Sequence, residues 1–100
     1  MAAVHYLPRA LEDLERLREF LADKDVVAAD ETIFLILDAM DVLVDHPLVG
    51  RPVGDGIREL VISRGRTGYV SLYHYDEPED RVLVAAIRHQ REAGYDPDRR

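Results

Sequence analysis

Apolar residues recur every three or four positions in the first half of the chain, which is the spacing of amphipathic helices. The first such stretch predicts a helix from Pro8 to about residue 23, because proline suits the first helical position. Asp25 can cap a second, longer helix, which His46-Pro47 should end. Since only two or three residues join the two helices, we expect an antiparallel hairpin.

The second half has the pattern of strands. Residues 57–63, 68–75 and 81–89 are rich in β-branched and aromatic side chains, and their connections are short enough for hairpins. We expect residues 3–7 to form a further short strand at an edge of the sheet, since Pro8 keeps Leu7 extended. The expected fold is α+β with the order β-α-α-β-β-β, an antiparallel sheet carrying the helical hairpin on one face. Residues 46–56, punctuated by glycine and proline, are expected to form a loop.

Alternation along the strand 68–75 sorts its side chains into two sets. Tyr69, Ser71, Tyr73 and Tyr75 share one face, and Val70 and Leu72 share the other. We expect the aliphatic set to meet the helices, which would place the tyrosine row on the open face. An equally weighted alternative is that the tyrosines only cover an apolar cluster.

Composition limits the possibilities. One hundred residues suit one domain, which we assign to residues 1–95 with a flexible tail at 96–100. The absence of cysteine excludes disulfides and thiolate zinc sites. No apolar run approaches the ~20 residues needed to span a bilayer, and no secretory signal is visible. We therefore expect a cytoplasmic protein without direct membrane contact.

The net charge of −7 is unevenly distributed. Residues 1–50 hold four basic and eleven acidic side chains, whereas residues 51–100 hold nine of each. The acidity therefore belongs to the helical half. The second half is locally basic, with two arginines, Arg64 and Arg66, at a predicted hairpin tip that suits phosphate or carboxylate as well as solvent.

Common catalytic motifs are missing. The four histidines are dispersed, so we expect no metal site, and no motif calls for a cofactor. The most unusual segment is 88–95, where an apolar strand turns polar. It brings an imidazole, a carboxylate and cationic groups together in eight residues.

The sequence resembles the RelE/ParE toxin superfamily over nearly its whole length. The likeness rests on HPLVGRPV (46–53), IRELVI (57–62), GYVSLYHY (68–75) and VLVAAIRHQREAGY (82–95), together with the element order. The resemblance implies the toxin of a type II toxin–antitoxin system, also called a plasmid stabilisation system. It also implies a hetero-oligomer in which a cognate antitoxin inactivates the toxin, with a ParD-like ribbon-helix-helix protein expected on the ParE branch.

The superfamily divides by target. ParE-like toxins inhibit DNA gyrase, and RelE-like toxins are ribosome-dependent mRNA endoribonucleases. An RNA-cleaving protein benefits from cations that contact phosphates, but this chain is acidic and its only lysine, Lys24, is on the first helix. We therefore expect a gyrase inhibitor first and an mRNA endoribonuclease second, and a relative that is inactive or has another target is the third alternative. A second nuclease subtype of the superfamily uses a glutamate, an arginine, a histidine and a terminal tyrosine. In this sequence the residues that could match that set are Arg64 or Arg66, His89, Glu92 and Tyr95, although Tyr95 is followed by DPDRR.

Two groups of candidate contact residues follow from the resemblance and from strand parity. Candidates for target binding are Arg58, Tyr73, His74, Arg88, His89, Arg91 and Tyr95. Candidates for antitoxin binding are the helical residues Leu14, Leu17, Leu21, Ile33 and Leu37. His74 departs from the LYRY of relatives and replaces a permanent cation by a group with a pKa near ~6.5.

Overall fold

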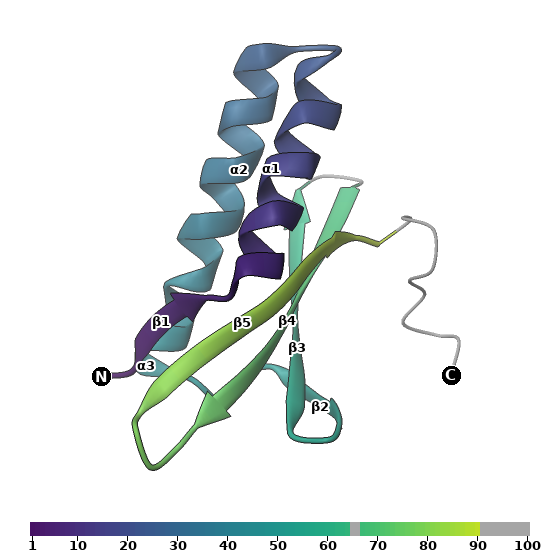
Figure 1. Ribbon diagram of the computed structural model, residues 1–100. Coiled ribbons are helices and arrows are strands. Elements are labelled where there is room, and N and C mark those ends of the chain that lie inside the picture. The colour runs from purple at the N-terminus through teal and green to yellow at the C-terminus, as the bar shows by residue number, and fades with distance from the viewer. Residues whose placement is uncertain (65–66, 91–100) are drawn as a thin grey trace.

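The computed structural model describes residues 1–64 and 67–90, and for residues 63, 64 and 67 it describes the backbone. Two layers are visible in Figure 1, a helical hairpin and a twisted five-stranded sheet. The predicted α+β class is confirmed. The elements are β1 (Ala3–Tyr6), α1 (Pro8–Ala22), α2 (Val26–Met40), α3 (Val42–Asp45), β2 (Arg51–Gly54), β3 (Ile57–Arg64), β4 (Thr67–Asp76) and β5 (Arg81–His89).

Local signals set the helix boundaries. Pro8 begins α1, as its fixed φ and missing N–H favour, and the Asp25 side chain caps α2 by accepting a hydrogen bond from the Ala28 N–H at 3.1 Å. The expected long second helix is interrupted at Asp41, after which α3 completes one more turn and ends before His46-Pro47.

The strand order is β1-β5-β4-β3-β2, so that β3, β4 and β5 form the predicted meander. At one edge β1 runs parallel to β5, with Ala3 opposite Arg81 and Tyr6 opposite Val84. The other edge is β2, which the sequence analysis assigned to a loop. All four of its residues are exposed and it contains Pro52, which is tolerated at a sheet edge.

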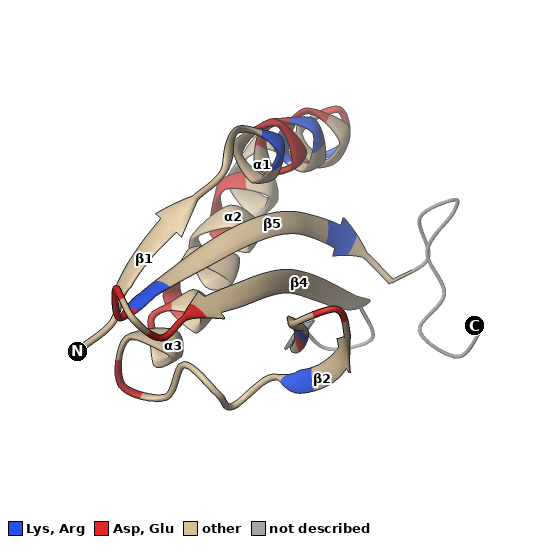
Figure 2. Cartoon of the chain, turned by 60° about the horizontal axis from the view of Figure 1, so that its bottom comes forward, with Lys and Arg blue, Asp and Glu red and all other residues tan. Residues whose placement is uncertain are grey.

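The core lies between the hairpin and the sheet. The hairpin packs against one face through α1, which lies along β5 (Figures 1 and 2). A bulge in β5 opposite Leu72 and Tyr73 shifts the pairing, so that Val84 and Ile87 both reach the core. Fully buried side chains from both layers fill it, including Ile36, Met40, Leu43, Val82, Val84 and Ile87. Burying each large apolar side chain contributes about 1.5–3 kcal/mol.

The predicted orientation of β4 is wrong. Tyr69 and Tyr73 belong to the core cluster under the helices, with Tyr75 packed against it. Alternation then turns Val70, Leu72 and His74 toward the second face. Tyr73 is tolerated in the core because its hydroxyl has a hydrogen-bond partner there.

Candidate functional site

Tyr73 and Arg58, two predicted target-binding residues, hold the loop between α3 and β2. The Gly50 N–H donates to the Tyr73 hydroxyl oxygen at 2.8 Å. Arg58 donates through Nη1 to the carbonyl oxygens of Leu48 and Gly50, at 3.0 and 2.8 Å. Burial raises the pKa of Tyr73, against the opposing effects of the Gly50 hydrogen bond and the Arg58 charge. Tyr73 is completely buried, so its assignment as a target contact is wrong; its burial gives it a structural role.

Gly50 is required by this arrangement. A Cβ at this position would lie 2.6 Å from the Tyr73 hydroxyl oxygen and 2.9 Å from the carbonyl oxygen of Glu59. Neither distance is compatible with a side chain. The backbone of the loop therefore packs directly against the tyrosine, and this close approach explains the glycine in the segment HPLVGRPV (46–53).

His74 is exposed on the second face of the sheet. Its Nδ1 lies 2.9 Å from the carbonyl oxygen of Gly56, which can only accept, so Nδ1 carries the proton in this hydrogen bond. The bond ties β4 to the β2–β3 turn, where Asp55 has a φ of 54° and Gly56 a φ of 75°. The other ring nitrogen, Nε2, remains at the surface, where a partner can reach it.

Arg88, another target candidate, pairs with Asp13 of α1. Asp13 also accepts a hydrogen bond from the Ile87 N–H at 3.0 Å and lies 3.4 Å from Arg16. Although burial by itself raises the pKa of Asp13, the hydrogen bonds from Ile87, Arg88 and Arg16 and the Arg88 charge outweigh it, so that the pKa is lowered. Arg88 thus joins α1 to β5.

His89 lies at the end of β5, next to the aromatic core. Its ring meets Tyr69 edge-on, with centroids 5.2 Å apart and an interplanar angle of 90°. This contact fixes the direction of the imidazole. Of the other residues in the conditional nuclease set, Arg64 is described by its backbone in β3, and Arg66, Glu92 and Tyr95 lie outside the described residues, as do Arg91 and the tail 96–100.

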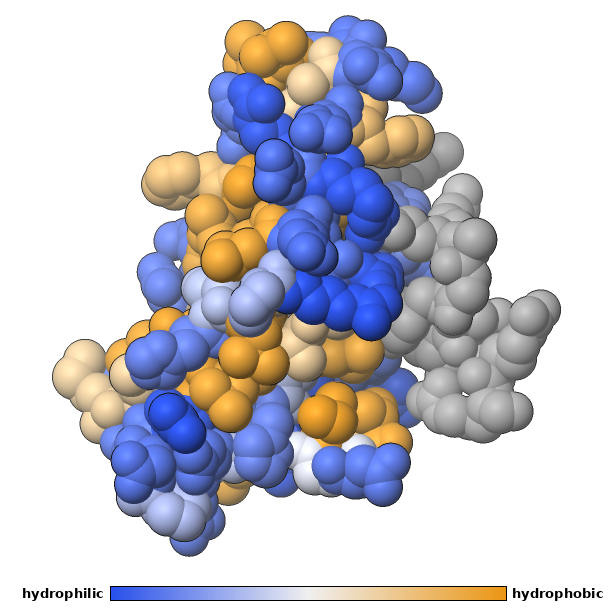
Figure 3. All heavy atoms as spheres, in the orientation of Figure 1, coloured by the Kyte–Doolittle hydropathy of each residue, from blue (hydrophilic) through white to orange (hydrophobic). Residues whose placement is uncertain are grey.

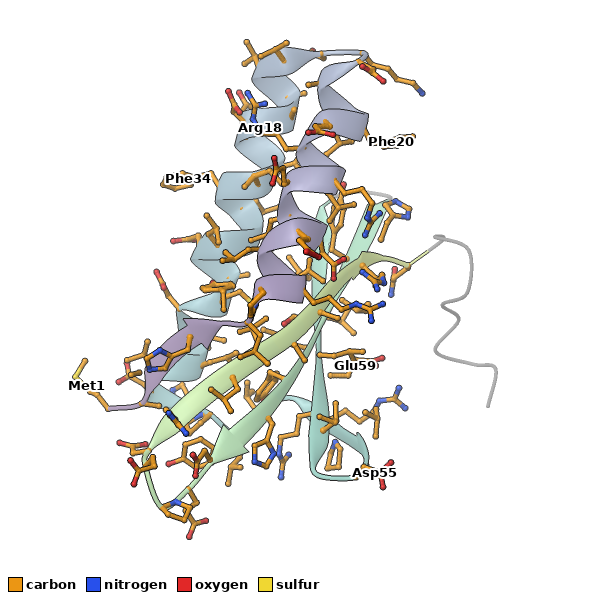
Figure 4. All side chains as sticks on the ribbon, in the orientation of Figure 1. Met1, Arg18, Phe20, Phe34, Asp55 and Glu59 are labelled. Carbon is orange, nitrogen blue, oxygen red and sulfur yellow. The ribbon has the colours of Figure 1, made fainter. Side chains whose placement is uncertain are left out.

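The helical candidates for antitoxin contact differ in how deeply their side chains are buried. Leu14 and Leu17 are buried in the core, so their prediction as contacts is wrong; helical spacing identifies an apolar side chain but not which layer covers it. Leu21 and Ile33 are half-buried and Leu37 is 37% exposed. The sequence analysis missed Phe34 and Phe20, which are 72% and 65% exposed. They project from opposite sides of the hairpin (Figure 4). The sequence did contain a signal for this exposure, because both phenylalanines lie outside the apolar positions that repeat every three or four residues.

The surface of the hairpin combines apolar and acidic side chains. Apolar residues gather at its far tip and again lower down over α2, with hydrophilic residues between them (Figure 3). Exposed apolar residues on α1 and α2 are Leu11, Phe20, Val26, Val27, Phe34 and Leu37. Arg18 and Asp30 bridge the two helices with an ion pair of 2.8 Å. Exposed apolar side chains among carboxylates are typical of a protein-binding surface.

Two searches for other sites gave negative results within residues 1–64 and 67–90. No three histidine, aspartate or glutamate side chains there come close enough to hold a metal ion. No helix in this part of the chain is long and apolar enough to cross a membrane.

Fold and sequence together define a class. The chain is similar to the chromosomal ParDE toxin–antitoxin system from P. aeruginosa, with a TM-score of 0.76 and 17% identity, over 89% of this chain and 96% of that one. It is also similar to a chain of the toxin–antitoxin complex RelBE2 from Mycobacterium tuberculosis, with a TM-score of 0.56 and 26% identity, over 88% and 96%. These matches confirm the RelE/ParE fold.

Sequence comparison places the chain more narrowly. Toxin RelE3 of Caulobacter vibrioides is 40% identical over 92 residues, which cover 92% of this chain and 98% of that protein. Toxin RelE1 of the same bacterium is 38% identical over 65 residues, or 65% and 70% of the two chains. The family described as "ParE toxin of type II toxin-antitoxin system, parDE" matches residues 4–94. The protein is a toxin of the type II class, and it belongs to the ParE toxin family.

Proposed function

We propose that this toxin is inactivated by a cognate antitoxin that covers the outer surface of the helical hairpin. The observation that carries the proposal is the exposure of Phe34 and Leu37 on α2, near the acidic residues Asp30, Asp38 and Asp41, the last of which follows the helix directly. An amphipathic segment with apolar and basic side chains complements such a surface. A ParD-like, ribbon-helix-helix antitoxin fits the ParE family, and Leu21, Ile33 and Leu37 stay as contact candidates.

We infer that the target is DNA gyrase. The net charge of −7 and the position of Lys24 at the hairpin tip support inhibition through contact with a protein rather than cleavage of RNA, which is a polyanion. In Figure 2 acidic residues are spread along the helices and the β4–β5 turn. His74, through its exposed Nε2, and the 88–95 segment are the proposed target contacts.

Cleavage of mRNA is the second candidate. The specific observation in its favour is the 40% identity to a protein named Toxin RelE3. It requires His89, held against Tyr69, to act with arginines and Glu92 as an acid–base set. This activity predicts that His89→Ala abolishes toxicity while antitoxin binding persists.

One experiment separates the two targets. The purified toxin is added to a gyrase supercoiling assay, and mRNA integrity is followed in cells that express it without antitoxin. Inhibited supercoiling with intact mRNA supports gyrase; cleaved mRNA with normal supercoiling supports the nuclease. His74→Ala should weaken inhibition, whereas His5→Ala, an exposed histidine on β1, serves as the control. Normal growth with both processes intact contradicts the toxin function itself.

A further inference from the structure

A pocket of about 580 Å³ is formed by residues next to α3 and the β4–β5 turn. These segments lie at the end of the molecule opposite the hairpin tip (Figure 1). The walls of the pocket are the segment 45–49 after α3, Tyr75 near the end of β4, and Glu77 in the β4–β5 turn. The volume is within the range of small-ligand sites, about 300–1,000 Å³. Of the candidate contacts discussed above, Arg58 touches this region through the Leu48 carbonyl oxygen, and the others are not among the lining residues.

The lining combines an apolar floor with negative charge. Pro47, Leu48 and Val49 supply apolar surface, and the last two are 54% and 55% exposed. Asp45 and Glu77 supply the carboxylates. Ordinary surface leucines need no explanation, but two adjacent exposed aliphatic residues that share a pocket with two acids suit a long side chain with a cationic end.

Neighbouring cations do not neutralise these two carboxylates. Arg81 pairs with Asp76 at 2.9 Å, and the amino terminus lies 3.5 Å from Asp80. Among the ion pairs of the described residues, none includes Asp45 or Glu77. Within the described part of the chain, these two pocket carboxylates are therefore available to a cation from a partner.

Tyr75 gives the pocket an ordered aromatic wall. Its hydroxyl donates to a carboxylate oxygen of Asp80 at 2.6 Å, and this bond, with burial and neighbouring acids, raises the pKa of Tyr75 to about 12. The phenol thus stays neutral and fixed. A planar guanidinium can stack on such a ring while it pairs with carboxylates, which a compact ammonium does less well.

We propose that this pocket binds an arginine side chain of the cognate antitoxin, with its methylenes on the apolar floor and its guanidinium between Asp45 and Glu77. The inference rests on the proposed toxin–antitoxin function and adds a second attachment point, remote from the outer surface of the hairpin. The bound arginine would anchor the antitoxin at the end of the toxin formed by α3 and the β4–β5 turn.

The test measures the affinity of the full toxin for the full-length antitoxin encoded beside it. Asp45→Asn/Glu77→Gln should weaken binding by about 10-fold or more, because the guanidinium loses both of its carboxylate partners. The charge-matched control is Asp55→Asn/Glu79→Gln, at exposed positions outside both the pocket lining and the hairpin, and should retain the wild-type affinity. An equal loss in both double variants would show general electrostatic attraction and overturn the pocket.

A second measurement probes the pocket directly. The amide derivative of acetyl-arginine, added to the isotope-labelled toxin, should shift NMR signals of residues 45–49, Tyr75 and Glu77. The uncharged isostere acetyl-citrulline amide should leave them in place. Equal shifts with both probes, or none with either, refute the pocket even if the antitoxin fails to bind. The toxin function and the pocket can fail separately. If the antitoxin relieves growth arrest but the pocket variants bind it as tightly as wild type, the toxin function is supported and only the pocket is rejected.

Discussion

The carboxylate of Asp13 on α1 accepts a hydrogen bond from the backbone N–H of Ile87 on β5, at 3.0 Å. Because β1 pairs only with residues 81–84, the edge of β5 beyond Val84 lacks a strand partner there. A buried edge N–H needs an acceptor, and α1 provides it. One side chain thus completes the sheet and fixes the helical layer on it.

Asp13→Asn should therefore destabilise the fold. The variant keeps an oxygen for Ile87 but leaves the Arg88 charge without its partner, and breaking a buried pair in this way costs about 3 kcal/mol. Urea unfolding at neutral pH measures the loss. Glu12→Gln, at the exposed neighbouring position, should change stability by less than about 0.5 kcal/mol.

The same pair sets a pH dependence. The pKa of Asp13 is lowered in the folded state, so the stabilisation is fully present above its ordinary value near 3.8 and is lost as pH falls through the folded value. The difference between wild type and Asp13→Asn should shrink steadily below pH ~4. A difference that stays constant down to full acid denaturation would contradict the assigned role.

Tyr73→Phe tests the contact between the core and the loop after α3. Loss of the hydroxyl leaves the buried Gly50 N–H without its acceptor, for a cost of about 1–3 kcal/mol. The measurement is the free energy of unfolding together with hydrogen exchange at Gly50, which should become faster. Tyr75→Phe is the matched control, since its hydroxyl bonds to the exposed Asp80. Equal exchange at Gly50 in both variants would remove the proposed role.

The sequence predicted where the helices and strands lie better than it predicted which face of a strand is buried. Periodicity placed α1, β3, β4 and β5 within a residue or two, because spacing and capping are local properties. It failed for β2, whose proline and glycine are those of a loop and whose pairing depends on β3. The orientation of β4 failed because both faces of that strand carry residues that can be buried, and only the volume under the helices decides between tyrosine and valine.

The candidate site was harder to predict for the same reason. Arg58, Tyr73 and Arg88 have the chemistry of binding residues, yet their hydrogen-bonding groups are directed to loop carbonyls, a glycine N–H and Asp13. Their partners lie 8, 23 and about 75 positions away along the chain, beyond any local pattern. His74 is exposed, although the expected orientation of β4 would have turned it toward the helices, and its role as a target contact stays a prediction.

Ser71 offers a substitution that should stabilise the protein. Its hydroxyl is completely buried, and no group among the described residues bonds to it. Burying an unpaired hydroxyl costs about 1–3 kcal/mol, partly offset in Ser71→Ala by a small cavity. We expect Ser71→Ala to raise the midpoint of thermal unfolding, whereas Thr32→Val, which loses a hydroxyl bonded to the Ala28 carbonyl at 2.8 Å, should not. A lower midpoint for Ser71→Ala would indicate that the hydroxyl has a partner.

Phe34 and Phe20 allow the antitoxin surface to be tested with matched variants. Both are exposed phenylalanines near the middle or end of a helix, but they lie on opposite sides of the hairpin (Figure 4). Phe34→Glu should weaken antitoxin binding by about 1.5–3 kcal/mol through lost apolar burial, and leave growth arrest by the free toxin unchanged. Phe20→Glu should leave the affinity near that of wild type. Calorimetric titration with the antitoxin provides the measurement, and circular dichroism checks that both variants fold. Equal affinities for the two variants would move the antitoxin surface away from the Phe34 side of α2.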